Sequence, residues 1–134
     1  MPVRIFVADD HDIVRAGIRS ILESQPDWII CGEAEDGVQA ISGICATKPD
    51  IAIVDITMPG RNGLEVAKEV SSLYPNIKVL IFTMHSAKTL VEAADDAGAH
   101  GLVLKSNADR DLIRALQALI NGKTFFEPGN APAA

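Results

Sequence analysis

The chain has 134 residues, a formal net charge of −6 and 48% hydrophobic residues, which suits one domain with a single core. No apolar run approaches the ~20 residues of a membrane-spanning helix, and the N-terminus lacks a signal-peptide pattern, so a cytoplasmic protein is expected. The negative charge argues against nucleic-acid binding by this chain itself, because such binding relies mainly on Lys and Arg. The two cysteines fit no metal-binding spacing.

Short apolar runs alternate along the chain with segments of helical period, the pattern of repeated βαβ units. Strands are expected at Val3–Ala8, Trp28–Ala34, Ile51–Val54, Val79–Phe82 and Leu102–Leu104. Helices are expected at about Asp12–Ser24, at Gly37–Thr47, after the N-cap candidates Asn62 and Ser86, and at Ala108–Asn121.

The central runs are continuously apolar, which indicates burial on both faces and therefore a parallel sheet between two helix layers. The prediction is a doubly wound, five-stranded α/β/α fold of the flavodoxin-like type. Its expected strand order is 2-1-3-4-5, with a crevice at the carboxyl ends of the first and third strands. Residues 123–134 are too short for another domain and are interpreted as a tail or the start of a linker.

Residues with side chains that phosphoryl chemistry could use follow four of the five expected strands. They are Asp9 and Asp10 after the first strand, Asp55 after the third, Thr83 after the fourth and Lys105 after the fifth. In a parallel sheet these strand ends meet at one edge, so the sequence predicts that three carboxylates, a hydroxyl and an ammonium converge there. Crowded carboxylates repel one another, and a hard divalent cation such as Mg²⁺ relieves that repulsion.

This set of groups suits phosphoryl transfer. Asp55 stands alone at the end of a central strand and is the predicted nucleophile, giving an acyl phosphate, whereas the adjacent Asp9 and Asp10 suit metal binding. Lys105 and Thr83 are expected to contact phosphoryl oxygens. The loop histidines, His11 and His85, are interpreted as bystanders, and the two neighbouring methionines, Met58 and Met84, as packing residues.

At these positions the chain resembles the receiver domain of two-component response regulators over about residues 3–122. The motifs are Val7-Ala8-Asp9-Asp10-His11, Asp55 through Gly63, Phe82-Thr83-Met84-His85 and Val103-Leu104-Lys105-Ser106. The resemblance implies that Asp55 accepts phosphate from the phosphohistidine of a sensor histidine kinase. It also implies that Asp10, Asp55 and the Thr57 carbonyl bind Mg²⁺ directly, with Asp9 acting through water.

Within the family, the motifs Met84-His85 and Leu104-Lys105-Ser106 look most like the LuxR-type (NarL/FixJ) transcription factors. That resemblance implies a receiver domain at 1–122 that controls transcription through a C-terminal helix-turn-helix domain absent from this chain; the alternative is a single-domain protein. A phosphorylation-switched regulatory domain, not an enzyme with an external substrate, is expected. Weak self-association through the last helix on phosphorylation is a further expectation.

The chain departs from the family at the position three residues before Lys105, where receivers usually have a Tyr or Phe ring that moves on phosphorylation and this chain has Leu102. An alternative function is therefore a receiver-like module that signals by interaction alone, without phosphate. Two other classes are compared. A haloacid-dehalogenase-type phosphatase needs a second acid two residues after its nucleophile, where this chain has Thr57. A flavodoxin-like nucleotide binder needs a first loop of backbone N–H donors, whereas Ala8 through Asp12 offers anions.

Overall fold

The computed structural model describes residues 2–84 and 88–126. The strands are β1 (Val3–Ala8), β2 (Trp28–Ala34), β3 (Ile51–Asp55), β4 (Lys78–Thr83), β5 (Gly101–Leu104) and β6 (Phe125–Phe126). The helices are α1 (Asp12–Leu22), α2 (Gly37–Thr47), α3 (Gly63–Leu73), α4 (Lys88–Asp96) and α5 (Ala108–Ile120), with a 3₁₀ turn, η1 (Lys105–Asn107), before α5. The expected N-cap Ser86 lies outside the described residues.

The strands form one parallel sheet in the order β2-β1-β3-β4-β5-β6. The predicted order 2-1-3-4-5 is confirmed. The predicted number of strands is wrong by one, because the chain returns after α5 and adds β6 beside β5. A two-residue strand is too short to show periodicity, so the first part of the predicted tail belongs to the sheet.

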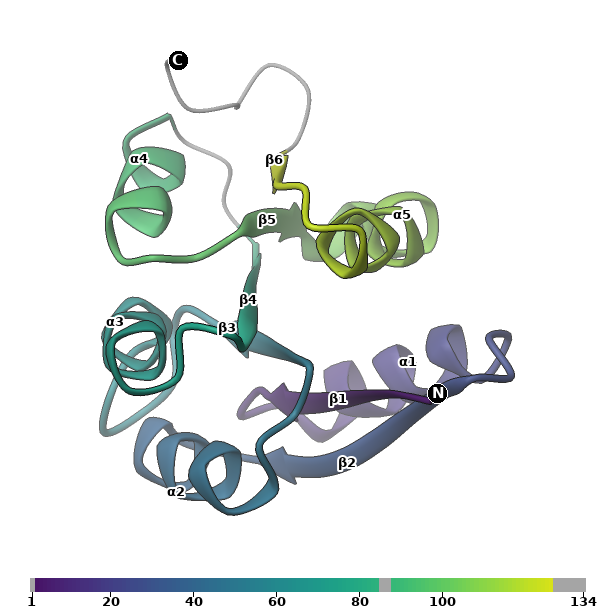
Figure 1. The fold of residues 1–134 in the computed structure, drawn as a ribbon, viewed down its shortest axis with the longest axis horizontal. Helices are drawn as coiled ribbons and strands as arrows, with labels where there is room; N and C mark the ends of the chain where they lie inside the picture. The colour runs from purple at the N-terminus through teal and green to yellow at the C-terminus, as the bar shows by residue number, and fades with distance from the viewer. Residues whose placement is uncertain (1, 85–87, 127–134) are drawn as a thin grey trace.

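Two helix layers cover the sheet, as Figure 1 shows: α2, α3 and α4 lie on one face, and α1 and α5 on the other. Alternate residues of each central strand face opposite layers. In β3, Ile51 and Ile53 pack with the α1/α5 layer, whereas Ala52 and Val54 pack with the other layer. All five β3 residues are buried, as the continuous apolar pattern indicated.

Local signals set the helix ends close to the predicted places. Asn62 begins α3 with a capping box, because its side chain accepts from the Glu65 N–H while the Glu65 side chain accepts from the Asn62 N–H. The first helix ends at Leu22, two residues before the predicted Ser24. These small differences are of the size expected for helix ends, which fray.

The β6 strand is held by His100, which precedes β5, and by Gly101, the first residue of β5. The His100 carbonyl accepts from the Phe125 N–H at 3.0 Å, and the His100 ring Nδ1 accepts from the Val79 N–H at 3.2 Å. A Cβ atom on Gly101 would lie 2.4 Å from the Phe125 carbonyl oxygen, so the close approach of β6 requires glycine there.

The His100 contact makes the stability of the protein depend on pH. Burial, and then the charge of Lys78, lower the pKa of His100. As the pH falls through about 6.5, the unfolded chain binds a proton that the folded His100 resists, so the free energy of unfolding declines. We expect the melting temperature to fall between pH 7.5 and 5.5 by more in the wild type than in His100→Asn, whose amide oxygen preserves an acceptor without titrating. Parallel pH profiles of the two proteins in thermal denaturation would contradict this expectation.

Candidate functional site

The predicted site residues meet at the carboxyl edge of the sheet. Strand pairing brings Asp55 opposite Phe82, and Thr83 opposite Leu104, so the ends of β3, β4 and β5 lie side by side. Asp9 follows β1 directly, and Lys105 follows β5. Asp9, Asp55 and Thr83 are each at most 2% exposed to solvent. The predicted convergence at this edge is therefore present.

The Lys105 ammonium joins two of the carboxylates. Its Nζ lies 2.8 Å from Asp9 Oδ2 and 3.3 Å from Asp55 Oδ1. The lysine side chain is itself only 12% exposed, so this charge contact is poorly screened by solvent. Lys105 thus offsets part of the repulsion between Asp9 and Asp55.

The two oxygens of Asp55 have different surroundings. Oδ1 contacts Lys105 and accepts from the Thr57 N–H at 3.4 Å, whereas the buried Oδ2 accepts no hydrogen bond within the described part of the chain. Burial, and then the negative charge of Asp9, raise the pKa of Asp55, and Lys105 and the Thr57 N–H only partly oppose this. One carboxylate oxygen of the predicted nucleophile therefore keeps its lone pairs available.

Asp10 and His11 lie beside Asp9 and Asp55 and form with them a cluster of side chains that could bind a metal ion. The ligand atoms of Asp9, Asp10, His11 and Asp55 all lie within 4.8 Å of one another. His11 Nδ1 is 3.2 Å from Asp9 Oδ1 and 3.1 Å from Asp10 Oδ1. His11, interpreted from sequence as a bystander, thus contacts both acids; its adjacency to them in the sequence was the available signal.

The donor chemistry of this group fits a hard divalent cation. Carboxylate oxygens are the ligands that Mg²⁺ prefers, and Asp55 Oδ2 is a buried oxygen of that kind that accepts no hydrogen bond from the described residues. A cation there would also relieve the repulsion that raises the Asp55 pKa. The residues predicted to bind the ion therefore suit it.

A tight loop behind Asp55 supports this edge. The Gly63 N–H donates to the Ile56 carbonyl at 3.0 Å, and a Cβ atom on Gly63 would lie 2.3 Å from the Asp55 carbonyl oxygen. Only glycine allows α3 to begin so close to the end of β3. Of the two neighbouring methionines, Met58 is buried as expected, whereas Met84 is 71% exposed and the packing interpretation is wrong for it.

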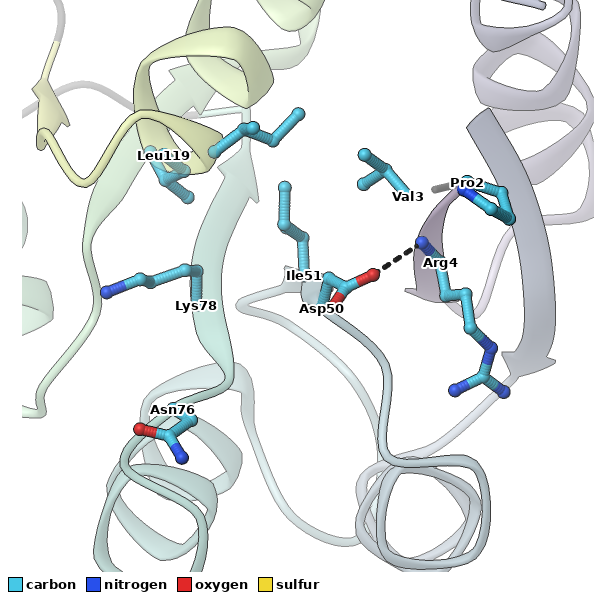
Figure 2. A pocket seen from close by; sticks show the side chains of 9 residues that line it. Pro2, Val3, Arg4, Asp50, Ile51, Asn76, Lys78 and Leu119 are labelled. Atoms are coloured by element: carbon cyan, nitrogen blue, oxygen red, sulfur yellow. Dashed lines mark hydrogen bonds between the residues drawn. The ribbon is translucent and has the colours of Figure 1, made fainter. Parts of the chain in front are cut away.

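The opposite edge of the sheet carries a cavity of about 440 Å³ with different properties (Figure 2). Its lining includes the first residues of several strands, among them Val3, Ile51 and Lys78. Asp50 Oδ2 accepts from the Arg4 N–H at 2.9 Å there, and the Arg4 guanidinium donates to the carbonyls of Thr47 and Lys48. These hydrogen bonds tie β1 to the end of α2 and the start of β3, which indicates a structural role.

The fold and its acidic edge are those of a regulatory phosphoacceptor domain. The sequence profile of the response regulator receiver domain matches residues 5–117, which include Asp9, Asp10, Asp55, Thr83 and Lys105. The chain belongs to this family. Receiver domains bind Mg²⁺ at an acidic pocket, and this chain has a cluster of acidic residues around Asp55.

Relatives and solved structures support the LuxR-type subfamily. The chain is 37% identical to the transcriptional regulatory protein YxjL of Bacillus subtilis over 124 residues, covering 92% of this chain and 57% of that protein. It is similar to the crystal structure of a LuxR-family two-component response regulator from Aurantimonas sp. SI85-9A1, with a TM-score of 0.92, 35% identity and coverage of 97% and 93% of the two chains.

A third similar structure is the isolated receiver domain of RcsB from Salmonella enterica serovar Typhimurium with the phosphomimetic BeF₃⁻. Its TM-score is 0.89 at 32% identity, over 97% of this chain and 96% of that one. The chain spans less than two thirds of the length of the curated relatives it matches. No helix in residues 2–84 and 88–126 is long and apolar enough to cross a bilayer.

The crowded carboxylates predict an unusual effect of the substitution Asp55→Asn. Because the folded-state pKa of Asp55 is raised, its charge at neutral pH lowers the free energy of unfolding, and a neutral amide removes that cost. Without divalent cations we expect Asp55→Asn to melt at least about 3 °C above the wild type. Added Mg²⁺ should narrow the difference, since it stabilises the wild type more. A variant that melts lower than the wild type in EDTA would contradict this expectation.

Proposed function

We propose that this chain is a phosphorylation-controlled receiver that accepts a phosphoryl group on Asp55 from the phosphohistidine of a sensor histidine kinase. The observation that carries the proposal is the unequal environment of the two Asp55 oxygens. Lys105 and the Thr57 N–H hold Oδ1 and orient the carboxylate, while Oδ2 accepts no hydrogen bond within the described residues, so the two oxygens can serve different partners, one the phosphorus and the other the ion.

In the proposed reaction a bond forms between an Asp55 carboxylate oxygen and phosphorus as the bond from phosphorus to the histidine nitrogen breaks. The neutral imidazole leaves on the donor, and Asp55 becomes an acyl phosphate. Lys105 exchanges its contact with Asp9 for one with a phosphoryl oxygen, and Thr83, at the end of β4, contacts another. These two residues neutralise and orient the incoming group.

Mg²⁺ supplies charge neutralisation at the phosphoryl oxygens when it is bound. We propose that Asp10, Asp55 and the Thr57 carbonyl hold the ion directly and that Asp9 acts through water. The support is the proximity of the carboxylates of Asp9, Asp10 and Asp55 and the Asp55 oxygen that has no hydrogen-bond partner among residues 2–84 and 88–126. Thr57 stands where a haloacid-dehalogenase-type phosphatase needs a second acid, which favours a phosphoacceptor over a hydrolase acting on external esters.

The names of several relatives favour transcription as the output. YxjL is named a transcriptional regulatory protein, and the Aurantimonas structure belongs to the LuxR family. We propose that phosphorylation of Asp55 controls transcription through a helix-turn-helix domain linked to this receiver, in the cytoplasm. The acidic charge of the receiver itself leaves DNA contacts to that other domain.

Phosphorylation of Asp55 is tested with a small phosphodonor. Incubation with acetyl phosphate and Mg²⁺ should add one phosphate, seen as a mass increase in intact-protein mass spectrometry, and EDTA should prevent it. Asp55→Asn should show no increase, because the amide is not a nucleophile for this transfer. Asp95→Asn, which changes an exposed acid on α4, is the matched control and should be labelled as the wild type is. Labelling of Asp55→Asn would exclude Asp55 as the acceptor.

We further propose weak self-association of the phosphorylated form through the face that carries α5. A groove of about 340 Å³ lies on that face, lined by Gly17 and Ile21 of α1 and Ala108 of α5. In sedimentation velocity, BeF₃⁻ with Mg²⁺ should shift the wild type towards a dimer at high concentration. Ile21→Glu should stay monomeric while retaining acetyl phosphate labelling. A wild type that remains monomeric at high concentration, both with and without BeF₃⁻ and Mg²⁺, would contradict the proposal.

A further inference from the structure

Arg15 of α1 is a charged side chain that the proposed chemistry does not use, yet it is almost buried. Its side chain is 10% exposed, although arginine is rarely placed inside a domain without partners. It lies six residues after Asp9 and reaches back from the second turn of the helix. There its guanidinium donates to the backbone carbonyl oxygen of Asp9 at 2.5 Å.

Carboxylates hold this guanidinium in place from two elements. Its Nε donates to Glu33 Oε1 at 3.2 Å, and another nitrogen donates to Glu35 Oε1 at 3.4 Å and to Asp12. Glu33 belongs to the edge strand β2, Glu35 follows it, and Asp12 begins α1. Arg15 therefore connects α1 and the β2 edge to the residue at the end of β1.

The contact fixes one peptide plane of the proposed ion site. The Asp9 carbonyl that accepts from Arg15 is in the same planar unit as the Asp10 nitrogen and Cα. On its other side, the Asp9 N–H donates to the Ala34 carbonyl at 3.0 Å. Both backbone polar groups of Asp9 are thus held, and the start of the Asp10 side chain is oriented with them.

We infer that Arg15 is a positioning residue for the divalent cation, holding the Asp9–Asp10 peptide so that the two carboxylates face the ion. This inference rests on the proposed function, because it concerns the same site. Arg15 acts through the backbone of Asp9 and contacts neither the ion nor the phosphoryl group. Loss of such a supporting contact costs about tenfold or more in metal affinity at other sites.

The sign of the effect distinguishes positioning from charge. Arg15 carries a positive charge close to the site, and a cation there repels Mg²⁺. If charge alone mattered, Arg15→Gln would bind Mg²⁺ more tightly. If Arg15 only stabilised the fold, the melting temperature would fall and the affinity of the folded protein would not change. Positioning predicts weaker binding in spite of the removed charge.

Arg19 provides a matched control on the same helix. Its guanidinium contacts both oxygens of Glu33, at 2.7 and 2.8 Å, so it shares a partner with Arg15. It donates to no atom of Asp9 among the contacts of the described residues. Arg19→Gln therefore removes the same charge and disturbs the same glutamate, while the Asp9 carbonyl keeps its donor.

The experiment is titration of the metal-free proteins with Mg²⁺ by calorimetry below their melting temperatures. We expect the Kd of Arg15→Gln to rise at least fivefold and that of Arg19→Gln to stay within twofold of the wild type. In acetyl phosphate labelling, Arg15→Gln should need more Mg²⁺ for half the maximal rate and should approach the wild-type rate at saturation. Arg15→Lys, which keeps the charge and one donor group, should restore part of the affinity.

An unchanged or lower Kd for Arg15→Gln overturns the inference while leaving the phosphoacceptor proposal intact. If Arg15→Gln does not fold, Arg15→Met decides instead, because it removes the charge and the donors without placing an amide in this nearly buried position. An unchanged or lower Kd in Arg15→Met overturns the inference, and a raised Kd supports it. A wild type that binds no Mg²⁺ contradicts the proposed ion site itself, and the inference falls with it. Labelling of Asp55 tests the proposed function separately.

Discussion

The Lys105 ammonium between Asp9 and Asp55 is the interaction on which the carboxyl edge of the sheet depends. Two buried carboxylates at the ends of neighbouring strands repel each other, and the ammonium, 2.8 Å from one and 3.3 Å from the other, is the cation that lets both remain there. Because Lys105 follows β5 directly, its position is set by the register of the sheet. The charge balance of the site is therefore built into the order of the strands.

This balance is incomplete, and the incompleteness suits the proposed chemistry. Burial and the charge of Asp9 still raise the pKa of Asp55 after the opposing effects of Lys105 and the Thr57 N–H. A site that fully satisfied its carboxylates would have little to gain from another cation or from a phosphoryl group. Here one buried oxygen of Asp55 stays without a hydrogen bond among the described residues, so added positive charge is favourable.

The order of the strands and the convergence of Asp9, Asp55, Thr83 and Lys105 could be predicted because hydrophobic periodicity and parallel topology determine them together. The roles of Arg15 and His11 could not be predicted in this way. Arg15 lies on the buried face of α1 with Ile18 and Leu22, and its partners Glu33 and Glu35 lie in and directly after the edge strand β2. Such a side-chain network depends on rotamers and on packing between elements, which periodicity does not encode.

The strand β6 could not be predicted from the sequence, because two residues are too few to show a hydrophobic period. Its presence affects where the domain ends. Leu102 is completely buried, and β6 pairs with Gly101 and Leu102, so Phe126 covers one flank of that leucine. A chain shortened after residue 122 would keep helices α1 to α5 but would expose the backbone of β5 and an apolar side chain beside it. An uncovered edge of that kind invites pairing with other molecules. The last described residues thus cover the backbone and the buried leucine of β5.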